Sequence, residues 1–239
     1  IEAIGEVIDN SGNSYIICAG NNKLFRLSGT TLTTLTYGGG GTAPTITSNN
    51  WQMAPLNGVL YLYQGGYDPL VFDPAVSTTT FRRVSEKTGY LGTAEQNNVA
   101  ISAFGRIWSG GNTTSKSTIQ FSDLLAGHVL STGTSGTIDL REVWPNGADE
   151  ITALAAHNGF LYIFGRRQIL VYKDAYDPAA MTLSDTVSGI GCCARDSVAL
   201  TGTDVIFLSD SGVRSLSRTI QEKSAPFRDI SANVRDDLV

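Results

Sequence analysis

The sequence predicts an all-β protein, specifically a β-propeller of short four-stranded blades with a non-propeller segment at its C-terminal end. Three observations lead to this prediction. A β-rich unit recurs along the chain at a nearly fixed period, as in propeller blades. The 26 glycines among 239 residues suit many tight turns. Charged residues make up only 16% of the chain, and Thr, Ser and Asn fill the gaps between apolar runs, which favours short strands over long helices.

Each repeating unit contains two apolar strands joined by a turn. Five such units occur, at residues 14–18 with 24–27, 57–63 with 70–73, 104–108 with 119–122, 158–164 with 169–172, and 203–208 with 212–216. If Tyr15, Leu60, Ile107, Leu161 and Val205 are equivalent positions, the intervals are 45, 47, 54 and 44 residues. These intervals match the roughly 40 to 50 residues of a four-stranded blade.

A further strand is expected before four of these units, at residues 52–55, 98–102, 151–155 and 197–200. Small side chains in these segments suit inner strands that crowd around an axis. The 54-residue interval contains an insertion between Ser122 and Glu150, and insertions of this kind lie on one face of a propeller. Alternating aromatic residues in the strands are expected to pack in the core, namely Tyr61, Tyr63, Tyr162, Phe164 and Phe207.

The repeat pattern ends after Leu216. We therefore predict blades over residues 1–217 and an exit segment over 218–239 that leads toward a second, platform domain. Ser231 is placed to cap a short helix that runs through Asp237. The chain begins with Ile1 and ends within a charged stretch, so we expect a fragment of a longer protein.

Charge and cysteine content narrow the possible partners. The net charge is -5, and basic residues are adjacent only at Arg82–Arg83 and Arg166–Arg167, so no nucleic-acid clamp is indicated. Three cysteines, with Cys192 and Cys193 adjacent, argue against a disulfide framework, and Cys18 is expected to be a buried thiol in a reducing compartment. No apolar stretch reaches the roughly 18 residues that span a bilayer, so we expect no membrane insertion by this segment.

Five groups of residues resemble chemical sites in part, but a structural explanation is favoured for each. His128 and His157 lack ligand spacing and are expected to be ordinary surface or turn histidines. Glycines 38–41 could suggest a phosphate-binding loop, but no Gly-Lys-Ser/Thr follows them, so we expect a flexible inter-blade loop. Residues 9–13 fit a hairpin turn better than a calcium loop. Residues 209–212 distantly resemble the Asp-box turn of sialidase propellers, but the aromatic residue that closes that motif is missing. The carboxylates Asp139, Glu142, Asp149 and Glu150 could form a glycosidase pair, but they are expected to be solvated loop charges. The sequence therefore predicts no enzyme, no cofactor, and no catalytic, cofactor-binding or metal-binding residues.

The second half of the chain resembles the tail nozzle, or tail tubular protein B, of short-tailed bacteriophages. The resemblance follows the order of segments 104–108, 119–124, 151–154, 161–164, 191–198 and 205–213. It implies a homo-oligomeric ring, commonly a hexamer, that contacts a tail adaptor protein and tail fibres in the virion and is assembled in the host cytoplasm. DNA would pass through this ring without specific binding. Members of the family are usually much longer than this chain.

Two other classes of protein remain as alternatives. A carbohydrate-binding or carbohydrate-cleaving propeller would have an axial pocket lined by convergent carboxylates, arginines or aromatic residues. An interaction scaffold of the kelch or WD type would repeat a Gly-Gly or Trp-Asp signature in every blade. Gly65–Gly66 and Gly110–Gly111 match the kelch signature in part.

Overall fold

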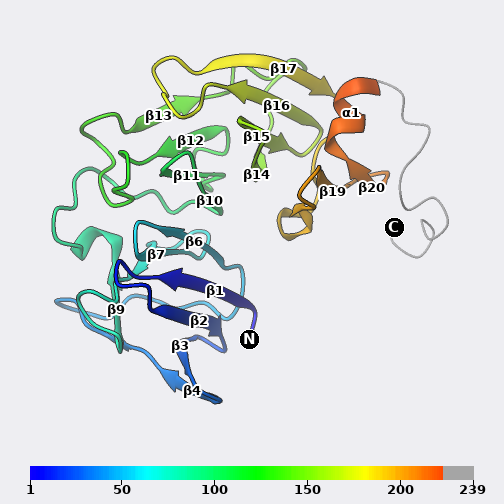
Figure 1. Ribbon diagram of the computed structural model, residues 1–239. Helices are drawn as coiled ribbons and strands as arrows, with labels where there is room; N and C mark the ends of the chain where they lie inside the picture. Colours follow the sequence, from blue (N-terminus) through cyan, green and yellow to red (C-terminus); the bar gives the residue numbers. More distant parts are fainter. Residues whose placement is uncertain (223–239) are drawn as a thin grey trace. The chain divides into compact units, whose positions relative to one another are not determined.

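The structure is a computed structural model that describes residues 1–222. Strands account for 45% and helices for 6%, which confirms the predicted all-β class. Five sheets follow one another along the chain, each built mainly from consecutive antiparallel strands, and the fold is propeller-like (Figure 1).

The first sheet is a four-stranded antiparallel meander of β1 (Ala3–Ile8), β2 (Ser14–Gly20), β3 (Lys23–Ser28) and β4 (Thr31–Thr34). The second sheet has the order β5-β9-β8-β7-β6. Its strands are β5 (Thr36–Tyr37), β6 (Gln52–Leu56), β7 (Val59–Tyr63), β8 (Leu70–Phe72) and β9 (Thr80–Arg83), followed by the short 3-10 helix η1 (Val84–Glu86). The added strand β5 pairs with β9 in parallel, so the segment after the first sheet extends the second.

The third sheet contains β10 (Val99–Ala103), β11 (Arg106–Gly110), β12 (Thr118–Phe121) and β13 (Gly136–Asp139). Strand β13 lies within the segment that the sequence analysis treated as an insertion. The long interval between repeats therefore includes the fourth strand of a blade as well as loops. The Ser122 hydroxyl fixes the start of this segment, because it accepts a hydrogen bond from the Ile107 backbone N–H at 3.0 Å.

The fourth sheet contains β14 (Ile151–His157), β15 (Phe160–Gly165), β16 (Gln168–Lys173) and β17 (Thr182–Ser188). The fifth has three strands, β18 (Ala199–Leu200), β19 (Val205–Ser209) and β20 (Gly212–Ser215), preceded by the 3-10 helix η2 (Arg195–Ser197). Helix α1 (Leu216–Glu222) follows β20 directly. The predicted boundary between blades and exit segment, after residue 217, falls inside α1 and stays a prediction. The helix predicted at 231–237 lies outside the described residues.

All five predicted hairpins are confirmed, as β2–β3, β7–β8, β11–β12, β15–β16 and β19–β20. The preceding strands are confirmed as β6, β10, β14 and β18, although β18 is shorter than predicted because η2 occupies its first position. Asn57–Gly58 and Asn158–Gly159 both have positive φ values. Turns of this sequence and conformation match the right-handed twist of hairpin strands, which explains why the second and fourth units look so alike.

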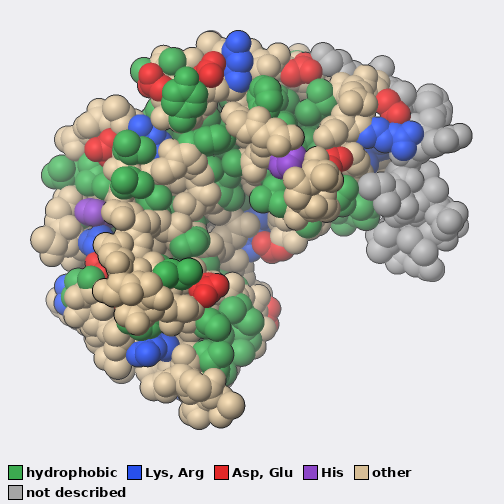
Figure 2. Space-filling model, in the orientation of Figure 1, with side chains coloured by type: hydrophobic (Ala, Val, Ile, Leu, Met, Phe, Trp, Pro, Cys, Tyr) green, Lys and Arg blue, Asp and Glu red, His purple; other side chains and the backbone are tan. Residues whose placement is uncertain are grey.

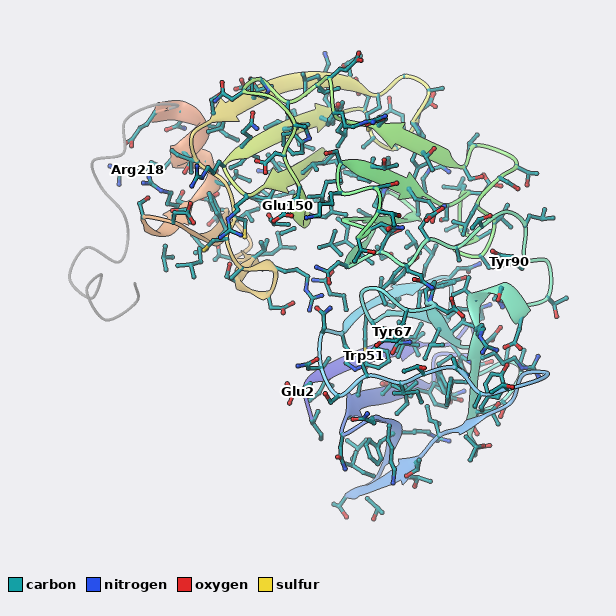
Figure 3. All side chains as sticks on the ribbon, turned by 180° about the vertical axis from the view of Figure 1, so that it is seen from behind. Glu2, Trp51, Tyr67, Tyr90, Glu150 and Arg218 are labelled. Carbon is teal, nitrogen blue, oxygen red and sulfur yellow. The ribbon has the colours of Figure 1, made fainter. Side chains whose placement is uncertain are left out.

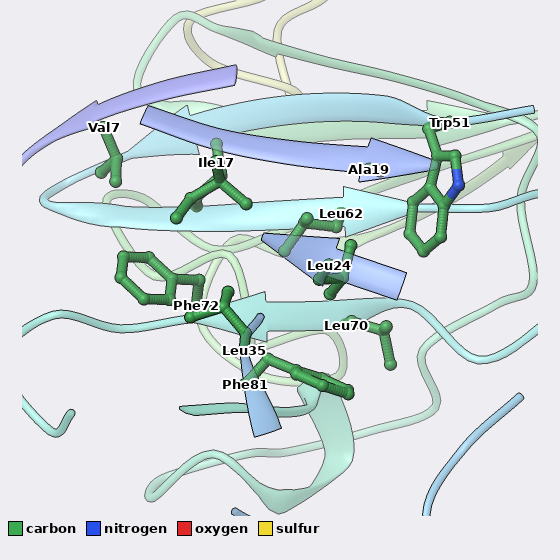
Figure 4. Packing of buried hydrophobic residues seen from close by; sticks show 11 residues of the cluster. Val7, Ile17, Ala19, Leu24, Leu35, Trp51, Leu62, Leu70, Phe72 and Phe81 are labelled. Carbon is green, nitrogen blue, oxygen red and sulfur yellow. The ribbon is translucent and has the colours of Figure 1, made fainter. Parts of the chain in front are cut away.

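The chain divides into two compact units, each with its own core. Unit 1 comprises Ile1–Ser115 and Ile119–Ile138, and unit 2 comprises Lys116–Thr118 and, among the described residues, 139–222. In unit 1 the second sheet is covered on both faces. Leu60 and Leu62 of β7 join a cluster with the first sheet (Figure 4), whereas Tyr61 and Tyr63 join a cluster with Ala100 and Ile107 of the third.

In unit 2 the fourth and fifth sheets pack together through Tyr162, Phe164, Val171, Val205 and Phe207. The ring centroids of Phe164 and Phe207 are 5.1 Å apart. The prediction that the alternating aromatic residues form core is confirmed, because Tyr61, Tyr63, Tyr162, Phe164 and Phe207 are all buried. Fully burying each such side chain contributes about 1.5–3 kcal/mol, so these sheet faces supply much of the stability of each unit.

Candidate functional site

A polar pocket of about 320 Å³ lies in unit 1 among the connections between strands. Its lining comes from the β1–β2 turn, the β6–β7 turn and the connections that follow β8, η1 and β12. We call it the turn pocket and define it by Asp9, Asn57, Tyr61, Asp73, Lys87 and His128. Its volume is at the lower end of the range for pockets that hold small molecules.

Two tight turns form one wall of the turn pocket. The Asp9 carboxylate accepts hydrogen bonds from the Asn13 side chain and backbone at 2.9 Å and from the Ser11 backbone at 2.8 Å, and these bonds lower the pKa of Asp9. The predicted hairpin turn at residues 9–13 is thus confirmed. The Asn57 amide donates to the carbonyl of Leu125 at 3.2 Å, which ties the second sheet to the β12–β13 connection.

His128 also lines the turn pocket and is half-buried in the turn that follows β12. Its Nδ1 is 3.2 Å from the Tyr61 hydroxyl. Burial lowers the pKa of His128, and the nearby Lys87 ammonium lowers it further. His128 is a turn residue, as predicted, but it is a pocket residue as well. His157, at the end of β14, is also half-buried, and its Nε2 is buried without a hydrogen-bond partner.

An ion pair between Lys87 and Asp73 lies in the turn pocket. The two side chains are only 15% and 13% exposed, so the pair is largely removed from water. The Asp73 carboxylate also accepts a hydrogen bond from the Ala75 backbone at 3.1 Å. This pair leaves no signal in the sequence, because the two residues are 14 positions apart and belong to no recognised motif. A buried pair of this kind adds little net stability but is costly to break.

The loop of glycines 38–41 follows β5 and is held by polar contacts. The Tyr37 hydroxyl donates to the carbonyl of Gly40 at 3.0 Å, and Arg83 donates to the Tyr37 hydroxyl at 2.7 Å and to the Thr42 carbonyl at 2.9 Å. The loop leads from β5 to β6, which both belong to the second sheet, so the prediction of an inter-blade loop is wrong. The chain passes from the first sheet to the second earlier, between β4 and β5.

Three of the four carboxylates near the insertion have separate local partners in unit 2. Asp139 binds Arg141, Glu150 (labelled in Figure 3) pairs with Lys116 Nζ at 3.0 Å, and Asp149 accepts a hydrogen bond from the Arg167 backbone N–H at 3.0 Å. Asp139 and Glu142 are exposed, as predicted, whereas Asp149 and Glu150 are half-buried. The turn at 209–212 joins β19 to β20, and Arg214 Nε donates to Ser209 Oγ across it at 3.0 Å.

The first sheet carries an apolar face that is not packed against the second sheet. Cross-strand pairing aligns Ile16, Leu27 and Leu32 on this face, together with Ile4 and Ile8 of β1. The exposed Glu6 lies between these two isoleucines, opposite Ile16, so the face is largely apolar with one carboxylate. Ile4 is 66%, Ile8 57% and Leu32 40% exposed, and hydrophobic side chains lie over this sheet in Figure 2. We call this surface the first-sheet outer face. Exposed apolar surface of this kind often marks a contact site.

The described residues 1–222 contain no group of three or more His, Cys, Asp or Glu residues that fits a metal ion. None of the helices among them is long and apolar enough to cross a membrane. The cysteines Cys18 and Cys192 are buried free thiols, and Cys193 is exposed.

No family model matches the sequence, and no curated protein matches it. Among solved structures, the chain is similar to the computationally designed Ika8 protein, with a TM-score of 0.50, 15% identity, and coverage of 84% of this chain and 54% of that chain. The designed Ika4 protein has a TM-score of 0.43 with 14% identity over 76% of this chain and 94% of that chain. BBS1N in complex with ARL6DN has a TM-score of 0.49 with 12% identity over 91% of this chain and 64% of that chain. At such identities the similarity extends to the fold alone.

Proposed function

We propose that this chain is the propeller part of a structural protein of a short phage tail, contributing to the ring-shaped nozzle through which DNA is ejected and to which fibres attach. The observation that carries this proposal is the first-sheet outer face. Its apolar residues alternate in the same way as those buried between sheets within unit 1. A surface with this pattern is suited to pack against another sheet or subunit.

The positions of the segments that resemble the nozzle family also support an assembly role. Segments 104–108 and 119–124 cover β11, β12 and the turn after them, and 151–154 and 161–164 cover β14 and β15. Segments 191–198 and 205–213 cover η2 and the β19–β20 hairpin. The resemblance therefore follows the inner and central strands of successive sheets, which are the strands that determine how sheets stack.

The proposed partners follow from the same role. A ring, commonly of six copies, would contact a tail adaptor protein on one side and carry fibres around it in the virion, after assembly in the host cytoplasm. Its lumen must let DNA pass without binding it, and the net charge of -5 favours this because it repels phosphate.

Light scattering and cryo-electron microscopy of the full-length protein test the proposal. We expect a closed ring with an axial channel. Replacing both Ile4 and Ile8 by lysine removes apolar contact area from the first-sheet outer face, and each isoleucine contributes about 1.5–3 kcal/mol when buried. Assembly of this double variant should therefore weaken by about tenfold or more.

The matched control is Tyr176→Lys, which changes another exposed apolar residue, 64% accessible, outside the first sheet. It should assemble like the wild type. A wild-type protein that stays monomeric at all concentrations, or an Ile4/Ile8 variant that forms rings as readily as the wild type, would contradict the proposal. A monomer that binds glycans would favour the carbohydrate-binding alternative instead.

A further inference from the structure

A second, smaller cavity lies in unit 1 beside the turn pocket. The two share Asp73 and Lys87, but the smaller one is lined in addition by Arg82 of β9 and by the hydroxyl residues Ser77, Thr80 and Thr88. We call it the arginine cavity. We propose that it binds a small oxyanion, that is, a phosphate or carboxylate group.

The charges around the arginine cavity leave a net positive charge. Lys87 and Asp73 neutralise each other in an ion pair. Arg82 has no ion-pair partner among the described residues, and its Nε lies buried without a hydrogen-bond acceptor. Two cations therefore face one carboxylate. An anion in the cavity would neutralise this excess positive charge.

The unsatisfied Nε–H of Arg82 points to a missing acceptor. Most buried polar groups in proteins have a hydrogen-bond partner, and an exception calls for a specific explanation such as water or an ion. A guanidinium group recognises planar and tetrahedral oxyanions well, because its N–H groups form a fixed fork. An oxyanion in the cavity would pair with the guanidinium charge of Arg82, which lines it.

The size of the arginine cavity restricts the ligand. Its volume is about 50 Å³, whereas one water molecule needs about 10–15 Å³. The cavity thus has room for a group of several heavy atoms but not for a whole sugar or nucleotide. The hydroxyls of Thr80 and Thr88 also line it and are able to donate hydrogen bonds to anionic oxygens.

Calorimetric titration of the full-length protein with sodium phosphate, against chloride at equal ionic strength, tests this proposal. We expect saturable binding with one site per chain. Arg82→Gln should weaken binding by about tenfold or more, because it removes a charge-assisted hydrogen bond. Competition by acetate would identify a carboxylate as an equally good ligand, and its failure to compete would identify the phosphate group as the preferred one.

Lys23→Gln is the matched control. It also removes one positive charge, but Lys23 is exposed at the start of β3 and does not line the arginine cavity. This variant should bind phosphate within about twofold of the wild type. Equal losses in the Lys23 and Arg82 variants would overturn the proposal, since they would indicate a general effect of charge.

A measurement on the wild-type protein avoids dependence on a variant that fails to fold. The Nε–H resonance of Arg82, followed by NMR, should shift as phosphate is added and should saturate with the same affinity as the calorimetric signal. An unchanged resonance, or the absence of saturable binding at tens of millimolar phosphate, would overturn the proposal. Neither outcome bears on ring assembly, so the oxyanion site and the nozzle proposal are tested separately.

Discussion

At the scale of single residues, His128 links the turn pocket to pH. Its folded-state pKa lies below the ordinary value because burial and Lys87 disfavour the imidazolium form. Below the ordinary histidine pKa of about 6.5, the unfolded chain binds a proton that the folded chain does not, so stability falls as pH falls. The full contribution of neutral His128 to stability is present above the unfolded-state pKa and is lost as pH falls toward the folded-state pKa.

We therefore expect the free energy of unfolding to decrease between neutral pH and mildly acidic pH, and His128→Gln to reduce this slope. Denaturant titrations of both proteins across that range measure the difference. Because the carboxylates with lowered pKa values, such as Asp9 and Asp123, are present in both proteins, the comparison isolates His128. Parallel stability profiles would show that His128 does not contribute.

The residues of the two cavities could not be found from the sequence. Asp73, Lys87 and Arg82 come from different connections and strands, and no local motif relates them. They meet because the β8–β9 connection and η1 fold back beside the second sheet. The sequence correctly identified residues with local explanations, such as the Asp9 turn, because their partners lie within a few positions.

At the scale of elements, the turn before His128 approaches the second and third sheets so closely that only glycine fits. A Cβ atom on Gly127 would lie 2.6 Å from the Tyr61 ring and 2.8 Å from Ile107 Cγ1. Both neighbours are 1% exposed and have little freedom to move. We expect Gly127→Ala to destabilise the protein by about 1–3 kcal/mol through overpacking.

Gly40→Ala is a suitable control, because a Cβ atom there meets nothing within 4 Å. Its unfolding free energy should stay within about 0.5 kcal/mol of the wild type. Chemical denaturation of the three proteins checks this prediction. Equal stability of the Gly127 and Gly40 variants would mean that the β12–β13 connection yields without cost.

The strands differ in how well their sequences predict them. Inner and central strands such as β7 and β15 are buried and rich in apolar residues, so their pattern is clear. The outer strands β4, β13 and β17 were not predicted, because they are largely exposed and carry many threonines and serines. Strand β5 contains two residues and pairs with β9 far along the chain, a non-local contact that leaves no local signal.

At the scale of the whole molecule, the repeat predicts one kind of sheet throughout, whereas the chain divides into two compact units. One hydrophobic cluster in unit 1 joins the first and second sheets, and one in unit 2 joins the fourth and fifth. Period and composition cannot reveal such a division, because every unit of the repeat has similar apolar content. A substitution in the core of one unit should therefore destabilise mainly that unit.

Phe164→Ala tests those consequences. Phe164 is fully buried and packs on Phe207, so truncation should cost about 3–5 kcal/mol. Since these contacts lie within unit 2, hydrogen exchange should accelerate across β14–β20 while β1–β3 and β6–β8 keep their protection. Phe72→Ala, which removes a buried ring from the unit 1 core, should give the reverse pattern. If either variant accelerates exchange equally in both units, the chain instead unfolds as a single cooperative body, and each core depends on the other for its stability.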